Sequence, residues 1–217
     1  MSKTPLFGGL PQEHLEKIGK IAADRYFRKG EIIFTEGDES TGFFIVARGK
    51  VKIFKVSTDG KEQILHIFGS GEPFGEVPVF SGQSFPASAE AIAKSHLLFF
   101  PRAAFAELIA NTPSLALNML AVLSIRLRQF TVQIENLSLR EVPVRLAAYL
   151  IHLADQQENS DGVSLSISKG QLASLLGTVP ETLSRSFAKL SAQDLIEVNG
   201  RHIRLLNREG LSVISGQ

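Results

Sequence analysis

The chain has 217 residues, of which 44% are hydrophobic and 21% are charged, with 23 lysines and arginines against 22 aspartates and glutamates. This composition excludes disorder of the whole chain, and a net charge of +1 excludes binding of nucleic acid or anionic membranes by bulk charge alone. The absence of cysteine excludes disulfides and cysteine-bound iron–sulfur clusters. We find no secretory signal and no run of 18 uncharged apolar residues, so we expect a soluble cytoplasmic protein without a membrane partner.

The first hundred residues have the pattern of an all-β domain. After a predicted helix over residues 12–22, nine glycines between positions 30 and 82 separate short runs rich in β-branched and aromatic residues. These runs are EIIF, FFIVA, KVKIFKV, QILHIF and SHLLFF. Turn residues at such close spacing are typical of a β-sandwich or barrel, so we predict a compact β-domain over residues 26–100.

The next segment is predicted to be helical. Residues 102–110 form a short helix, and a second helix starts at Pro113 and runs to Ser138, a length of about 39 Å. Its apolar residues alternate at spacings of three and four, which is a heptad seam. The seam residues are Leu120, Leu123, Leu127, Phe130, Ile134 and Leu137. We predict that the seam forms a homodimer; the alternative is that it packs on the chain's own β-domain. Met119, Val122 and Ile125 lie off the seam and are predicted to make that contact instead.

The last third of the chain has the order of a winged helix-turn-helix. A helix from about Arg140 leads to a polar loop at 155–162, which is followed by the strand VSLSIS and the helices KGQLASLLG and PETLSRSFAKLSAQ. Gly177 ends the first of these two helices, and Pro180 lies in the first turn of the second. The final segment, DLIEVNGRHIRLL, is typical of two strands around Asn199-Gly200 and predicts a type I′ hairpin.

The second of these helices has two faces of opposite character. The apolar set at helical spacing is Leu183, Phe187 and Leu190, and the set on another face is Glu181, Ser184, Arg185 and Ala188. Arginine can bond guanine twice, glutamate can accept from cytosine, and serine can contact either base edge. Glu181 is also spaced to hold the guanidinium of Arg185. We predict DNA contacts from Lys169, Glu181, Thr182, Ser184, Arg185, Lys189 and Arg201. The alternative is an ordinary solvated helix face.

A β-rich domain, a long helix and a winged helix-turn-helix, in this order, resemble the CRP/FNR superfamily of bacterial transcription regulators over nearly the whole chain. The segments that carry the likeness are FFIVARGKVKIFKVSTDGKEQILHIFGSGEPFGE and PETLSRSFAKL. The resemblance implies an α+β fold with three parts. These are a cyclic-nucleotide-binding-like β-roll for effector sensing (1–112), a dimerisation helix (113–139) and a winged helix-turn-helix DNA-binding domain (140–217).

The helix PETLSRSFAKL also matches a motif of particular branches of this superfamily. Glu181, Ser184 and Arg185 match the E-x-x-S-R triad of the FNR and DNR branches, whereas the cyclic AMP receptor branch has glycine where Ser184 stands. The resemblance therefore implies a homodimer that binds palindromic double-stranded DNA with TTGA-type half-sites and works with RNA polymerase.

The resemblance places an effector pocket in the β-roll. The implied pocket residues are Phe74, Gly75, Glu76, Pro86, Ala87, Phe130 and Thr131. Cyclic AMP receptors balance the cyclic phosphate with an arginine whose position here falls near Pro86, and no lysine or arginine occurs between Lys61 and Lys94. A buried phosphate would lack its counter-charge, so we predict that cyclic AMP is not the effector.

The segments FPASAEA and PETLSR resemble the DNR and HcpR branch. This likeness implies control of nitrogen-oxide metabolism, with haem as the candidate sensor of nitric oxide. His14 and His66 are the first candidates for its axial ligand, although a lone histidine is more often structural. Two alternatives are a cyclic-nucleotide-responsive regulator and a cyclic-nucleotide-binding module without DNA function. An enzyme using Glu76, Asp59 and histidines is not expected, because no nucleophile elbow, Walker loop or metal-ligand motif is present.

Overall fold

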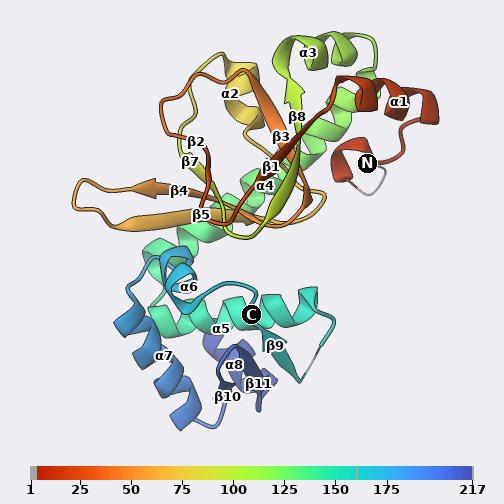
Figure 1. Ribbon diagram of the computed structural model, residues 1–217. Coiled ribbons are helices and arrows are strands. Elements are labelled where there is room, and N and C mark those ends of the chain that lie inside the picture. Colours follow the sequence, from red (N-terminus) through yellow and green to blue (C-terminus); the bar gives the residue numbers. More distant parts are fainter. Residues whose placement is uncertain (1–3, 160, 217) are drawn as a thin grey trace. The chain divides into compact units, whose positions relative to one another are not determined.

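The computed structural model describes residues 4–159 and 161–216. The chain divides into two compact units, Met1–Arg128 and Gln129–Gln217, and the boundary falls inside one long helix. Figure 1 labels most strands of the first unit and the helices and hairpin of the second. The β-rich and the helix-rich parts of the sequence therefore form separate units.

The first unit is built mainly on strands, as the glycine spacing predicts. It opens with the short 3-10 helix η1 (Pro5–Phe7) and α1 (Gln12–Ile21). Its strands are β1 (Ala23–Phe27), β2 (Ile32–Phe34), β3 (Gly42–Arg48), β4 (Val51–Val56), β5 (Glu62–Phe68), β6 (Pro73–Phe74), β7 (Ser88–Ala91) and β8 (Ser95–Pro101). The helix α2 (Glu76–Ser81) lies between β6 and β7, and α3 (Arg102–Ala110) follows β8. The five predicted runs correspond to β2, β3, β4, β5 and β8, whereas β1, β6 and β7 are additional.

The strands pair into two antiparallel four-stranded sheets, ordered β1-β8-β3-β6 and β2-β7-β4-β5. One apolar cluster fills the space between the sheets and consists of Phe34, Phe44, Val46, Val51, Phe68, Phe74, Phe85, Ala89 and Leu97. A second cluster packs α1, α3 and the start of the long helix against the other face of the first sheet, through residues such as Phe43, Ile45 and Phe105. Because side chains alternate along β3, Phe44 and Val46 lie in the first cluster, whereas Phe43 and Ile45 lie in the second. The predicted roll is confirmed.

The long helix α4 (Pro113–Leu139) begins where the sequence predicts. Leu115 N donates to Thr112 O at 2.9 Å in its first turn, and Leu115 and Met119 are buried against the first unit. The off-seam residue Ile125 is 60% exposed, so its predicted contact with the β-domain is wrong. In a straight helix it points to the side opposite Leu127.

Much of the predicted seam on α4 lies at the surface of the single chain. The side chains of Leu120, Leu127 and Ile134 are 59%, 68% and 64% exposed. By length and composition α4 is apolar enough to cross a membrane, with a mean hydropathy of 1.3 in its most apolar window, of which 11% is buried. Helices of soluble proteins pass the same test, and a helix that pairs with a second copy has this composition too.

The second unit combines helices with a small sheet. After the end of α4 its elements are α5 (Val142–Gln156), β9 (Gly162–Ser164), α6 (Lys169–Leu175), α7 (Pro180–Ala192), β10 (Ile196–Asn199), β11 (His202–Leu205) and α8 (Arg208–Ser215). The helix α5 packs against α7 and α8, and the sheet has the order β10-β11-β9. The strand β9 is shorter than predicted because its partner β11 is short. The helix α8 was not predicted; Asn207 caps it by accepting from Gly210 N at 2.8 Å.

The hairpin of the second unit forms at the predicted place with a different turn. Asn199 pairs with His202, so Gly200 and Arg201 are the two turn residues. Only Gly200 has a positive φ, +62°, whereas a type I′ turn needs a positive φ at both central residues. The predicted type I′ turn is therefore wrong, because Asn199 joins the strand ladder instead of the turn.

Candidate DNA-binding surface and effector site

Local hydrogen bonds fix the start and the end of α6, the helix before α7. At its start Ser168 Oγ accepts from Gln171 N at 3.1 Å, and Gln171 Oε1 accepts from Ser168 N at 2.9 Å. This reciprocal pair is a capping box, whose S-x-x-Q signal stands in the sequence. At its end Gly177 adopts a φ of +64°, and Thr178 N donates back into the last turn at 2.9 Å. The tight turn holds α7 at a defined angle to α6.

The predicted division of α7 into two faces is confirmed. Leu183, Phe187 and Leu190 are buried in the core of the second unit. Glu181, Ser184, Arg185 and Ala188 are exposed. The apolar face anchors the helix, so the opposite face can carry polar groups to a partner without any loss of core packing.

The guanidinium of Arg185 is held by a different residue from the one predicted. Arg185 Nη2 donates to Thr182 Oγ1 at 3.1 Å, and within residues 161–216 no ion pair joins Arg185 to Glu181. A helical side chain leans toward the preceding turn, where Thr182 lies three residues back. The prediction that Glu181 holds Arg185 is therefore wrong. One hydrogen bond to Thr182 leaves most N–H donors of Arg185 available to a ligand.

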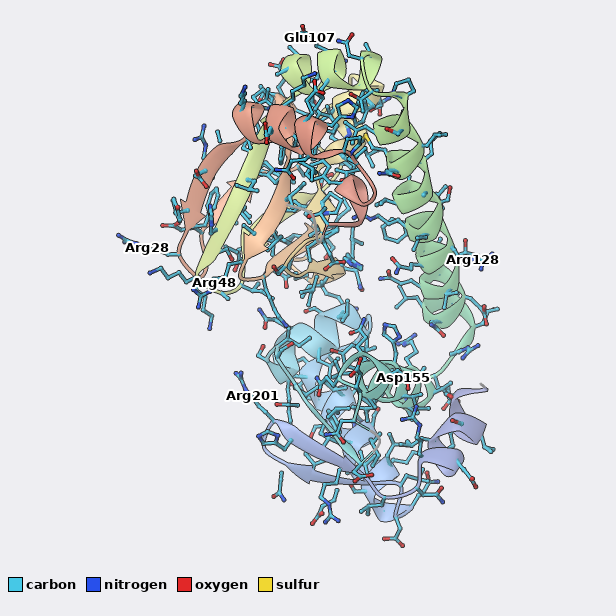
Figure 2. The ribbon with its side chains drawn as sticks, turned by 90° about the vertical axis from the view of Figure 1, so that its right-hand side faces the viewer. Arg28, Arg48, Glu107, Arg128, Asp155 and Arg201 are labelled. Atoms are coloured by element: carbon cyan, nitrogen blue, oxygen red, sulfur yellow. The ribbon has the colours of Figure 1, made fainter. Side chains whose placement is uncertain are left out.

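The remaining predicted DNA contacts lie on separate elements of the second unit. Lys169 is exposed in the first turn of α6, and its Nζ is 5.2 Å from the centroid of the Phe187 ring. Lys189 is exposed on α7, and Arg201 is exposed in the turn of the hairpin. Figure 2 shows Arg201 extending outward from this hairpin. The structure thus gathers Glu181, Thr182, Ser184, Arg185 and Lys189 on one helix.

Glu76, the carboxylate of the predicted effector pocket, is already paired within the first unit. Its side chain is 4% exposed and accepts a hydrogen bond from Arg126 Nη1 of α4. Arg126 Nη2 donates to Pro73 O at 2.6 Å, and the guanidinium lies 4.9 Å from the centroid of the Phe68 ring. Sequence reasoning missed Arg126, which lies 50 residues from Glu76 and shares no motif with it. The pairing compensates both charges without a ligand.

Aromatic rings occupy the interior of the roll beside Gly75. Phe34 and Phe85 stack with centroids 3.7 Å apart, and Phe74 is fully buried next to them. Gly75 has a φ of +74°, and a Cβ there would approach the Phe85 ring at 3.2 Å. The cavity beside Glu76 has a volume of about 10 Å³, roughly the space for one water. The rings and the Glu76 pair leave little preformed room for an effector here.

The other residues of the predicted pocket are dispersed. Ala87 is buried, whereas Pro86 is exposed. Phe130 and Thr131 lie on the part of α4 that belongs to the second unit, so their contact with an effector stays a prediction. The buried cation Lys52 is also paired, to Glu62 at 2.5 Å and to Glu90 at 3.0 Å.

The two histidines considered as haem ligands differ in their surroundings. His66 Nε2 lies 3.9 Å from Glu72 Oε1, and Gly69 N donates to Glu72 Oε2 at 2.6 Å. Burial raises the pKa of Glu72, but His66, the Gly69 amide and Arg126 together outweigh burial and hold that pKa below its ordinary value. His14 on α1 has a buried Nδ1 that lacks a hydrogen-bond partner among the described residues. His14 is therefore the better candidate for a ligand.

Comparison with known proteins bears on both sites. The family model "Cyclic nucleotide-binding domain" matches residues 24–112, and "Crp-like helix-turn-helix domain" matches residues 144–214. The cyclic AMP receptor protein of Thermus thermophilus is 33% identical over 198 residues, which cover 91% of this chain and 90% of that protein.

Solved structures give the same result. FixK2 from Bradyrhizobium japonicum has a TM-score of 0.79 at 26% identity, covering 89% of this chain and 97% of that one. DNR from Pseudomonas aeruginosa has a TM-score of 0.51 at 30% identity, covering 98% and 95%. These matches confirm the resemblance and the α+β fold expected from the sequence. The chain therefore belongs to the CRP/FNR family, whose members are DNA-binding transcriptional regulators and not enzymes.

Proposed function

We propose that this chain is a homodimeric, cytoplasmic transcriptional regulator that recognises a palindromic DNA site through α7 and responds to an effector other than cyclic AMP. The observation that carries the proposal is the exposed face of α7. Its polar residues are presented by a helix whose other face is buried in the core. Effector binding in the first unit would bias how two α4 helices pack, and with it the spacing of the two α7 helices.

We assign base recognition to three residues of α7. Arg185 bonds a guanine, Glu181 accepts from the paired cytosine, and the Ser184 hydroxyl contacts a flanking thymine. This assignment suits TTGA-type half-sites. In a symmetric dimer the two half-sites lie about one helical turn, roughly 34 Å, apart. Lys169, Thr182, Lys189 and Arg201 then surround these residues as further DNA contacts.

Two variants test the assignment of Arg185. Arg185→Ala is expected to cost about 1–3 kcal/mol per half-site and to relax the preference at the G·C pair. Lys169→Ala is the matched comparison, because an ammonium in the first turn of α6 suits a phosphate and its loss should weaken all sequences alike. The measurement is a binding titration of both variants with the palindrome and a G·C-altered copy. Equal losses on both DNAs for Arg185→Ala would make Arg185 a backbone contact.

Dimerisation through α4 is supported by the exposed seam. Leu120, Leu127 and Ile134 present apolar area that a second α4 would cover. A dimer would also place two α7 helices on one DNA site, which is what a palindrome requires. Promoter-bound protein would then act on RNA polymerase.

Cyclic AMP does not suit the roll as it is packed here. The Arg126 guanidinium is engaged by Glu76 and Pro73 O, and Lys52 is engaged by two carboxylates. A cyclic phosphate would need a cation that is not already compensated. The relative from Thermus thermophilus is named a cyclic AMP receptor protein, so binding of cyclic AMP to this chain should be measured directly. We expect calorimetry with cyclic AMP to show no binding at micromolar concentration, and a cyclic-nucleotide-dependent shift of promoter DNA would contradict the proposal.

Haem is the effector group to test first, in a role that senses nitric oxide. The orphaned, buried Nδ1 of His14 is a nitrogen that could bind iron, and bound haem would supply the metal that nitric oxide recognises. Protein purified from haem-supplied cells is expected to show a Soret band that shifts with nitric oxide. The band should weaken in His14→Ala and persist in His66→Ala. A spectrum without haem in the wild type would rule out this effector.

A further inference from the structure

Asn199 and Gly200 form the single Asn-Gly pair of the sequence, which contains six asparagines. The pair lies at the tip of the hairpin between β10 and β11, where Asn199 and His202 are the last pair of the ladder. Both Asn199 and Gly200 are exposed. A Cβ built on Gly200 would meet no heavy atom within 4 Å, so the space around this peptide bond is open.

The two groups that can react with each other at this pair are free. Within residues 161–216 the Asn199 side chain forms no hydrogen bond, and the backbone N–H of Gly200 has no acceptor. Gly200 has a φ of +62° and no side chain that would hinder rotation. Opening of the last pair of the ladder lets Gly200 N approach Asn199 Cγ, and the tip of a hairpin is where such local opening costs least.

Three of the other asparagines are followed by a backbone amide that is already bonded. Asn118 and Asn136 lie inside α4, where the next amide belongs to the hydrogen-bond ladder of the helix. After Asn111, Thr112 N donates to Ile109 O at 3.0 Å. Each of these amides would have to leave its acceptor before it could attack a neighbouring side chain.

Two more asparagines have an occupied side chain. Asn207 Oδ1 accepts from Gly210 N at 2.8 Å, and Asn159 Oδ1 accepts from Asp161 N at 3.0 Å. Among the described residues Asn199 therefore combines a free side chain with a free following amide, which none of the other asparagines does.

We propose that Asn199 is a site of spontaneous deamidation in the folded protein, with water as the other reactant. Gly200 N forms a bond to Asn199 Cγ, the Cγ–Nδ2 bond breaks, and ammonia leaves with the proton of the Gly200 amide. Water then opens the cyclic imide at one of its two carbonyl carbons. One opening leaves aspartate and the other isoaspartate, and both products carry a carboxylate at neutral pH.

The new carboxylate would lie beside the exposed cation of the hairpin turn. Arg201 forms no ion pair within residues 161–216, whereas Arg204 is already paired with Glu197 at 2.6 Å. A carboxylate at position 199 would compensate Arg201 and repel a phosphate that approaches it. Isoaspartate would also lengthen the backbone at the last pair of the ladder. The effect on DNA binding rests on the proposed function, but the reaction does not.

The first arm of the test follows the chemistry without DNA. Full-length protein is kept folded at mildly alkaline pH for several weeks, and peptide mapping by mass spectrometry measures deamidation at each asparagine. We expect the peptide with Asn199 to react first, with isoaspartate among its products, while Asn207 stays intact. The rate should rise with pH, because the attacking amide has to lose its proton. Conversion of Asn199 that is no faster than that of Asn207, or that requires denaturant, overturns the proposal.

The second arm measures binding of the palindrome before and after the same incubation. Wild type is compared with Asn199→Gln, whose longer side chain forms a cyclic imide far more slowly, and with Asn199→Asp, which has the charge of the product from the start. We expect the slope of log affinity against log salt to fall by about 0.9 per modified chain, the share of one phosphate contact. Fresh Asn199→Asp should show the same smaller slope, and Asn199→Gln should keep wild-type binding throughout.

The two arms separate this proposal from the proposed function. Deamidation of Asn199 with unchanged binding of the palindrome overturns the effect on DNA. Equal losses of affinity in incubated wild type and incubated Asn199→Gln also overturn it, because they assign the loss to another site. Fresh wild type without a preference for the palindrome would instead overturn the proposed function, and the first arm would still decide whether Asn199 reacts.

Discussion

The two units treat their polar side chains in opposite ways. In the first, the charges at the predicted effector site are buried and paired: Glu76 with Arg126, and Lys52 with two glutamates. In the second, Glu181 and Ser184 are exposed and Arg185 is tied by one hydrogen bond to a hydroxyl. The winged helix-turn-helix therefore presents a surface that is ready for a ligand. The roll already pairs the charges of Glu76 and Lys52, so an anionic effector there has to displace existing contacts.

The largest effect is expected at the proposed dimer seam of α4. Leu127→Lys would bury a charge in the seam twice, once from each α4, which should cost the dimer about 5 kcal/mol or more. Ile125→Lys is the matched control, because Ile125 is similarly exposed on the opposite side of the helix. Sedimentation at micromolar concentration should show a monomer for Leu127→Lys and a dimer for Ile125→Lys. A monomeric wild type would contradict the dimer.

A smaller effect tests whether the roll depends on its internal ion pair. Arg126→Leu leaves the Glu76 carboxylate buried without a partner, and we expect a loss of about 3–5 kcal/mol in the free energy of unfolding. Adding Glu76→Gln to Arg126→Leu should recover part of this loss, because the unpaired charge is gone. Denaturant titration measures the free energy of unfolding of the single and the double variant. If the single variant is as stable as the wild type, the pair does not organise the roll.

The third effect arises inside the second unit and depends on pH. Burial raises the pKa of Tyr149 to about 12, whereas the unfolded chain titrates near 10. Below pH 10 the phenol is neutral in both states. Between pH 10 and 12 only the unfolded state ionises, so stability falls by about 2–3 kcal/mol across this window. Denaturant titrations at pH 9.5 and 11.5 should show a smaller loss for Tyr149→Phe than for wild type. Equal losses would mean that Tyr149 titrates normally when folded.

The second unit could be predicted closely from the sequence because its signals are local. Pro180 and Gly177 mark the ends of α7 and α6, and helical spacing separates Leu183 from Ser184. Each signal acts within a few residues of its effect. The helix α8 and the partner of Arg185 were not predicted. The type of the hairpin turn was predicted wrongly, since it depends on which residues the two strands pair. A shift of one residue moved Asn199 out of the turn.

The effector site could not be predicted to the same depth because its partners are distant in sequence. Nothing in the residues around Glu76 indicates Arg126, which approaches from a helix 50 residues further on. The stack of Phe85 on Phe34 likewise depends on how β2 and β7 pair. The sequence has no lysine or arginine between Lys61 and Lys94, around Glu76. The positive charge that compensates Glu76 comes instead from Arg126 on α4.

The order β1-β8-β3-β6 also has a consequence for how the chain is made. The strand β8, the last of the roll, lies between β1 and β3, and among the described residues it is the only neighbour of β1 in its sheet. During synthesis β1 can therefore pair only after Ser95–Pro101 has left the ribosome. Closing so long a loop carries an entropy cost that the short hairpin of the second unit avoids. A chain that stops before β8 leaves the edges of β1 and β3 open to other chains, and we expect it to aggregate through them.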